Sequence, residues 1–137
     1  FSTTGNSYPH IVLRGGKKPN YDAACIAACE EALREAHLPL NILVDCSHGN
    51  SGKKAERQGL VLKNILSQIE AGNRAIRGFM LESNLEGGNQ PMQANPALLN
   101  PRCSVTDECI DWPTTEALLR EAHARISKLV RKESEDN

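Results

Sequence analysis

The stretch NILVDCSHGNSG, residues 41–52, decides the fold of this chain. An apolar run leads into Asp45 and then into a small polar turn that carries His48, which is typical of a buried parallel strand that ends in a loop. Side chains at the carboxyl end of such a strand commonly face a pocket. We therefore expect Asp45 and His48 at the mouth of a site, and we interpret the rest of the chain around this strand.

Two further strands are predicted, one before and one after this stretch. Residues 10–14 (HIVLR) precede two glycines, and residues 75–82 (AIRGFMLE) end in an acid. Apolar residues at helical spacing predict helices from about Asp22 to before Pro39, over about 54–71, and after Pro113. The resulting order of elements predicts three successive βα units, and hence an α/β fold with a parallel sheet.

The long segment of residues 83–112 is rich in Asn, Gly and Pro and has no predicted helix or strand. A segment of this kind inside a compact domain is more often functional than idle, and it contains Asp107. The helix that follows has a predicted buried stripe of apolar residues, namely Leu119, Ala122, Ile126, Leu129 and Val130. We expect residues 133–137 to form a frayed tail.

Composition limits the classes of partner. The 137 residues are 39% apolar and 24% charged with a formal net charge of −1, so no global field attracts nucleic acid or anionic lipid. No window has the roughly 18 uncharged apolar residues of a membrane span, and the polar start lacks the apolar region of a signal peptide. The five cysteines lack disulfide-framework spacing, and Cys25 and Cys29 are expected as small buried hydrophobes. We expect a cytoplasmic protein without nucleic-acid or membrane partners.

Charged or ionisable residues end each predicted strand: Arg14, Asp45 with His48, and Glu82. Because parallel strands share one carboxyl edge, His48, Glu82 and Asp107 can form a divalent metal site whose mixed nitrogen and oxygen ligands suit Mn, Fe, Co or Zn. Asp45 is placed to orient the imidazole. The alternatives are a His48 that hydrogen-bonds the next strand, and carboxylates that pair with Arg14 or cap helices.

A basic loop, RGGKK, follows the first predicted strand. A guanidinium, flexible backbone and two ammonium groups suit a phosphate or carboxylate ligand. The alternative for Lys17 and Lys18 is a solvated basic turn, whereas Arg14 ends an apolar strand. Arg14 and Lys17 are therefore the candidates for substrate binding. The chain has no GxGxxG motif and no Walker loop, so nucleotide binding has no support.

Four motifs occur in order along the chain: LRGGKKPNY, VDCSHGNS, MLESN followed by EGGNQ, and SVTDECI with a tryptophan two residues on. Together they closely resemble the C-terminal part of class I 3-deoxy-7-phosphoheptulonate (DAHP) synthases. The resemblance implies a (β/α)8 TIM barrel, in which residues 1–137 would be a single partial domain with strands six to eight and their helices. A closed barrel has eight strands and about 250 residues, so these units would form less than half of one.

The resemblance also implies a reaction, the condensation of phosphoenolpyruvate with erythrose 4-phosphate to DAHP and phosphate, which opens the shikimate route to aromatic amino acids. The family holds its divalent metal with a Cys, a His, a Glu and an Asp. The last three map onto His48, Glu82 and Asp107, and Arg14 matches an arginine that contacts phosphoenolpyruvate. His48 and Arg14 are thus the expected catalytic residues, with His48 as a metal ligand rather than a general base.

One part of the family pattern is missing. The cysteine ligand comes from a motif resembling GPCSIHD, which this chain lacks, and Cys46 is disfavoured as a substitute. We therefore expect activity to need the N-terminal part of the same enzyme, this chain alone to be inactive, and the whole to be a homo-oligomer. One alternative is a non-catalytic half-barrel that oligomerises through open sheet edges and binds phosphorylated ligands. Another is a metal-dependent phosphohydrolase with its own complete site.

Overall fold

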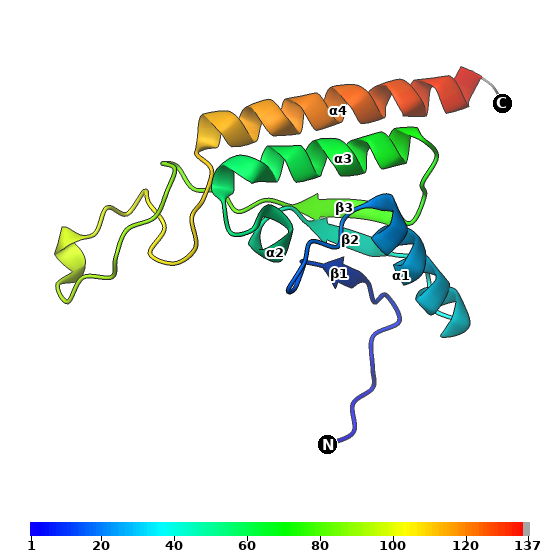
Figure 1. Ribbon diagram of the computed structural model, residues 1–137, viewed down its shortest axis with the longest axis horizontal. Helices are drawn as coiled ribbons and strands as arrows, with labels where there is room; N and C mark the ends of the chain where they lie inside the picture. Colours follow the sequence, from blue (N-terminus) through cyan, green and yellow to red (C-terminus); the bar gives the residue numbers. More distant parts are fainter. Residues whose placement is uncertain (136–137) are drawn as a thin grey trace.

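A computed structural model describes residues 1–135, with side chains described as far as Leu129. Its centre is a sheet of three parallel strands in the order β1-β2-β3. The strands are β1 (Ile11–Leu13), β2 (Ile42–Asp45) and β3 (Ile76–Met80). Figure 1 shows β2 in the middle of the sheet, with its carboxyl end beside those of its neighbours. The predicted α/β class and parallel sheet are confirmed.

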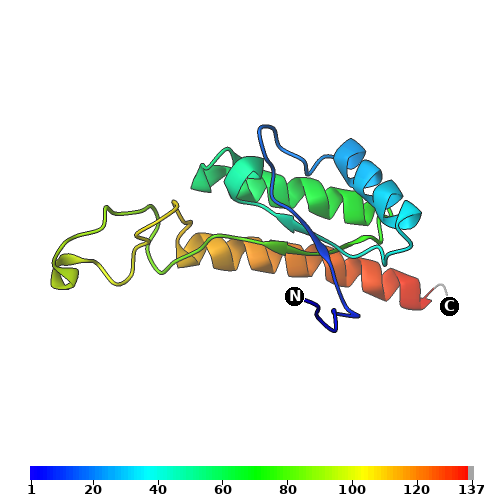
Figure 2. The same cartoon turned by 90° about the horizontal axis from the view of Figure 1, so that it is seen from below.

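Three long helices accompany the strands, α1 (Ala23–Glu35), α3 (Gln58–Glu70) and α4 (Trp112–Glu135). Asp22 caps α1, because its carboxylate accepts a hydrogen bond from the backbone N–H of Cys25 at 2.9 Å. Figure 2 shows α1 and α3 over the same face of the sheet. Arg125 of α4 donates to both carboxylate oxygens of Glu70 on α3, at 2.6 and 2.8 Å. The two helices run side by side in the same direction (Figure 1).

The core lies between β2 and α3. Ile42 and Val44 of β2 are fully buried and share one apolar cluster with Val61 and Ile65 of α3. Fully burying an aliphatic side chain of this size contributes about 1.5–3 kcal/mol to the free energy of unfolding. Strand β2 is the central strand and pairs with a neighbour on each edge. Its continuous apolar sequence predicted a buried strand of this kind.

The bounds of several elements differ from the predicted ones. Residues after β2 form a short helix, α2 (His48–Ser51), where a polar loop was predicted. A 3₁₀ turn, η1 (Ala55–Arg57), precedes α3, which therefore begins at Gln58. Strand β3 ends at Met80 instead of Glu82, because the backbone N–H of Glu82 donates to the side chain of Gln58 at 2.8 Å instead of to a neighbouring strand.

The segment between β3 and α4 extends away from the sheet (Figure 1) and contains one 3₁₀ turn, η2 (Pro96–Leu98). Its two ends are joined by backbone hydrogen bonds: Ile110 donates to Glu82 at 3.0 Å, and Gly88 and Cys109 exchange bonds of 2.8 and 3.1 Å. Side-chain bonds from Gln90 to Asn100 and Cys103 hold the outer part. The segment is therefore ordered by its own polar groups.

The predicted buried stripe of α4 is confirmed at Ala122 and Ile126 and is wrong at Leu119. Leu118 and Ala122 are buried against the core, whereas Leu119 is 42% exposed. Gly59 of α3 sets this contact, since a Cβ there would lie 3.3 Å from Leu118 Cδ2. The helix runs to Glu135, so the first residues of the expected frayed tail are helical. Residues 136–137 and the side chain of Val130 lie outside the described part of the chain.

Two further expectations concern α1 and membranes. Cys25 and Cys29 are half-buried rather than buried, because Ile26 and Leu33 form the face of α1 that packs on the core. Among the described residues, no helix combines the length and the apolar character that crossing a bilayer requires.

Candidate metal centre

The imidazole of His48 is held in one orientation at the carboxyl end of β2. Asp45 is the last residue of the strand and is almost fully buried. Its Oδ2 lies 2.7 Å from His48 Nδ1, and its Oδ1 accepts from the backbone N–H of Ser47 at 2.8 Å. Because an ionised carboxylate only accepts hydrogen bonds, Nδ1 is the nitrogen that donates to Asp45, and in a neutral imidazole with this tautomer Nε2 carries the lone pair that can bind a metal. The contact predicted between Asp45 and the imidazole is present.

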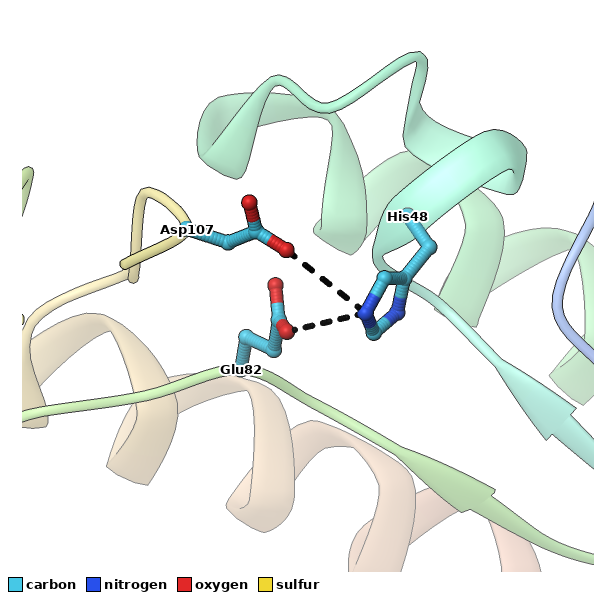
Figure 3. A group of neighbouring side chains, drawn as sticks. All are labelled: His48, Glu82 and Asp107. Carbon is cyan, nitrogen blue, oxygen red and sulfur yellow. Dashed lines mark ion pairs between the residues drawn. The ribbon is translucent and has the colours of Figure 1, made fainter.

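Two carboxylates face this lone pair (Figure 3). His48 Nε2 lies 3.3 Å from Glu82 Oε1 and 3.7 Å from Asp107 Oδ2. The candidate ligand atoms of the three residues all lie within 4.8 Å of one another. The structure thus brings together the three side chains that the sequence predicted to meet, although they are far apart along the chain.

Glu82 is positioned by the first residue of α3. The side-chain amide of Gln58 accepts from the backbone N–H of Glu82 at 2.8 Å and donates to its carbonyl oxygen at 3.0 Å. Gln58 is fully buried, so this pair of bonds is shielded from water. Sequence reasoning missed Gln58, whose only signal was a polar residue at the start of an apolar helix.

Asp107 is positioned by the joined ends of the long segment. Asn89 donates to the carbonyl oxygen of Thr106 at 2.9 Å. Glu108 accepts from the backbone N–H of Ala55, in η1, at 3.1 Å. These bonds fix the residues on both sides of Asp107, whose side chain is 49% exposed. The long segment therefore holds the Asp107 carboxylate toward His48 (Figure 3), although this carboxylate is not buried.

The donor set fits a divalent cation. One imidazole nitrogen and two carboxylate oxygens suit Zn, Mn, Fe or Co. Ligand atoms about 2.1 Å from a common ion lie about 3 to 4 Å apart, and the separations of 3.3 and 3.7 Å fall in this range. The cavity between them has a volume of about 10 Å³, which is room for roughly one water-sized sphere. The site can therefore hold a single ion with an open coordination position.

The predicted substrate-binding residues lie near this cluster but outside it. Arg14 is exposed and makes no ion pair with the side chains described as far as Leu129, while its carbonyl oxygen accepts from the backbone N–H of Gly49 at 3.1 Å. Lys17 lines a separate, larger cavity. Cys46 is fully buried, and burial with the nearby Asp45 charge raises the pKa of its thiol to about 12. A neutral thiol facing the core is a poor substitute for a thiolate ligand.

Asn50 joins the ends of β1 and β2, a role that was not predicted from the sequence. Its side-chain amide donates to the carbonyl oxygens of Leu13, at 3.0 Å, and Asp45, at 2.8 Å. Its side-chain oxygen accepts from the backbone N–H of Asn20 at 2.8 Å. One buried side chain thus ties the loop after β1 to the strand that delivers His48.

The fold is an α/β fold with a parallel sheet, and an imidazole and two carboxylates meet at the carboxyl ends of its strands. These features define a candidate metal-dependent α/β protein. Comparison with known families is consistent with this class, since the model of the DAHP synthetase I family matches residues 1–120. The chain belongs to that family.

Curated relatives share this assignment. The Tyr-sensitive phospho-2-dehydro-3-deoxyheptonate aldolase of Salmonella typhimurium is 47% identical over 125 residues, which are 91% of this chain and 35% of the relative. The Phe-sensitive enzyme of Escherichia coli K12 is 44% identical over 120 residues, or 88% of this chain and 34% of the relative. The chain therefore spans about a third of the length of these relatives.

A solved structure agrees with the sequence relatives. The phospho-2-dehydro-3-deoxyheptonate aldolase of Francisella tularensis superposes with a TM-score of 0.85 at 38% sequence identity. The alignment covers 93% of this chain and 37% of the solved one. The arrangement of strands and helices described above is therefore also found within a larger member of the same group.

Proposed function

We propose that this chain is the C-terminal portion of a metal-dependent DAHP synthase. In the proposed reaction, phosphoenolpyruvate and erythrose 4-phosphate condense to DAHP with release of phosphate, the first step of the shikimate pathway. Family membership supports the reaction class. The single observation that carries the proposal is the convergence of His48, Glu82 and Asp107 on one small cavity.

The proposal includes a TIM barrel in which β1, β2 and β3 are strands six to eight. Strands β1 and β3 each have one unpaired edge, and apolar side chains at these strands, Val12 and Met80, are exposed. We propose that the N-terminal part of the same enzyme pairs with both edges and supplies the cysteine ligand. The assembled enzyme is proposed to be a homo-oligomer, and the 137-residue chain alone to be inactive.

Each site residue has a proposed role in this reaction. When bound by His48, Glu82 and Asp107, a divalent ion (Mn, Fe, Co or Zn) supplies a Lewis acid for the aldehyde oxygen of erythrose 4-phosphate. His48 presents Nε2 to the ion, since Nδ1 is committed to Asp45, and so does not act as the general base. The Arg14 guanidinium binds and neutralises anionic phosphoenolpyruvate, and Lys17 adds positive charge further along the same loop.

The covalent changes follow from these roles. C3 of phosphoenolpyruvate forms a bond to the aldehyde carbon of erythrose 4-phosphate, whose oxygen takes up a proton. The oxygen of a water molecule adds at C2, and the bond between C2 and the bridging phosphate oxygen breaks, so that C2 becomes a ketone and inorganic phosphate departs. The two protons of the water go to the former aldehyde oxygen and to the phosphate. Because the leaving group is phosphate, its release measures the reaction directly.

The test is the His48→Ala variant of the full-length protein. We expect phosphate release from the two substrates to fall by at least about 100-fold, because removing a metal ligand removes most of the bound ion. Metal content measured by mass spectrometry should fall with it. His123→Ala on α4 is the matched control and should retain both. Full activity of His48→Ala after chelation would contradict the proposal.

A second candidate is the non-catalytic half-barrel that oligomerises through its sheet edges. The observation that favours it is the exposure of apolar side chains at both edge strands, at Ile11 and Val12 in β1 and at Met80 in β3. Exposed strand edges promote association between chains. The size distribution of the isolated 137-residue chain in solution separates the two candidates.

A further inference from the structure

A second cavity adjoins the candidate metal centre. It has a volume of about 530 Å³ and forms where the loop after β1 meets α2 and the first turn of α3. Ser51 and Lys53 line both cavities and separate them. A volume of this size lies in the range of sites for small organic ligands, about 300–1,000 Å³, whereas the metal-centre cavity holds only an ion or a water.

The second cavity is lined by cationic side chains, Lys17, Lys53 and Arg57, and by no acidic residue. None of the three forms an ion pair with any residue in the part of the chain that the structure describes. The Arg57 guanidinium lies at the cavity wall, since a Cβ on Gly52 would be 3.6 Å from its Nη1. Because the whole chain has a formal net charge of −1, this concentration of positive charge is local.

The walls of the cavity are held in place by contacts within the chain. Gly15 and Gly49 touch, so that a Cβ on Gly15 would lie 2.5 Å from the Gly49 carbonyl carbon. The Asn50 side chain bonds to both strands and to the loop, as described above. Preformed walls reduce the entropy lost when a ligand binds.

Part of the remaining lining is apolar or aromatic. Leu60 is 65% exposed, although it lies on α3 beside the cavity. Tyr21 also lines the cavity, and its hydroxyl has no hydrogen-bond partner among the described residues. Cations on one side and apolar surface on the other match an anionic group attached to a carbon skeleton.

We propose that this cavity binds a small phosphorylated organic molecule at a site distinct from the metal centre. The Arg57 guanidinium and the Lys53 ammonium group neutralise the charge of a phosphate ester, and the guanidinium offers it paired N–H donors. Leu60 and Tyr21 contact the carbon skeleton. The inference rests on the cavity alone and holds whether or not the proposed synthase reaction is correct.

The test uses the full-length protein, freed of metal, with radiolabelled inorganic phosphate as the probe. Equilibrium dialysis at constant ionic strength counts the phosphate bound per chain. We expect the dissociation constant for phosphate at one class of sites to rise at least about five-fold in the Lys53→Gln/Arg57→Gln double variant. Lys63→Gln, which removes a cation from α3 outside the cavity, is the control and should bind as wild type does.

The Arg14→Gln variant separates this site from the proposed substrate site. If the two sites are distinct, losses of bound phosphate in Arg14→Gln and in the double variant add when the changes are combined. Unchanged phosphate binding in the double variant, or binding lost wholly in Arg14→Gln, would overturn the proposal. Lys53 and Arg57 are exposed, so the variants should fold, and near-ultraviolet circular dichroism checks this.

Discussion

At the scale of single residues, the candidate metal centre depends on side chains that hold its ligands in place. His48 has a φ of +46°, in the left-handed region that non-glycine residues rarely adopt. Its bond to Asp45 stabilises this conformation and leaves Nε2 free. The sequence predicted the part played by Asp45, because it lies three residues away. Gln58 could not be predicted, because its bonds to Glu82 span 24 residues and leave no periodic signature.

Replacing Gln58 with alanine tests this dependence. We expect affinity for Zn or Mn to fall about 10–100-fold, as for other groups that position metal ligands. Stability should also fall by about 1–3 kcal/mol, because the backbone groups of Glu82 lose their partners. Calorimetric metal titration and urea unfolding of the full-length protein measure the two effects.

Gln68→Ala is the control for this prediction. Gln68 lies on the same helix and donates to the carbonyl oxygen of Tyr21 at 2.8 Å. Its side chain bonds to none of the three candidate metal ligands. Its loss should lower stability while the metal affinity stays unchanged. Equal metal affinities for the Gln58→Ala and Gln68→Ala proteins would mean that Gln58 does not position Glu82.

At the scale of elements, the site depends on the contact between the loop after β1 and α2. Gly15 has a φ of +72° and its backbone touches that of Gly49. The sequence predicted a strand end followed by a glycine stop, but it did not predict which of the two glycines makes the contact. Close backbone approach between distant loops is set by tertiary packing, which local patterns do not report.

The two neighbouring glycines offer a matched comparison. Gly15→Ala should destabilise the full-length protein by about 2 kcal/mol or more, since a left-handed conformation alone costs about 1–2 kcal/mol and the new Cβ overlaps Gly49. Gly16→Ala should change stability by less than about 0.5 kcal/mol, because a Cβ there meets nothing within 4 Å. Urea unfolding measures both. Equal stabilities of the Gly15→Ala and Gly16→Ala proteins would show that the loop after β1 can move away from α2 at no cost.

At the scale of the whole molecule, the order of strands and helices followed from hydrophobic periodicity, because each element buries one face. Ala122 and Ile126 were predicted on the buried face of α4, but Leu118 was not. Leu118 and Leu119 are adjacent and both apolar, and the close approach of Gly59 to Leu118 decides between them. The approach of Glu82 to His48 was predictable, because both follow parallel strands that share one carboxyl edge. Asp107 was a candidate because it lies in a long segment of the kind that is often functional, and the family resemblance pointed to the same residue.

The exposed strand edges predict the behaviour of the isolated 137-residue chain. If β1 and β3 normally pair with the rest of a barrel, we expect the chain alone to form heterogeneous assemblies in size-exclusion chromatography with light scattering. Val12→Lys should reduce this association by placing a charge at the edge. A single compact dimer would favour the half-barrel candidate, and a stable monomer would contradict both.

The long segment that carries Asp107 has a consequence for how this protein can vary. Its base is closed by the bond from Ile110 to Glu82 and by the pairing of Gly88 with Cys109. Its tip, around η2, extends away from the sheet in Figure 1. We therefore expect insertions, deletions and substitutions to be tolerated more readily at the tip than at the base of the segment, close to Asp107.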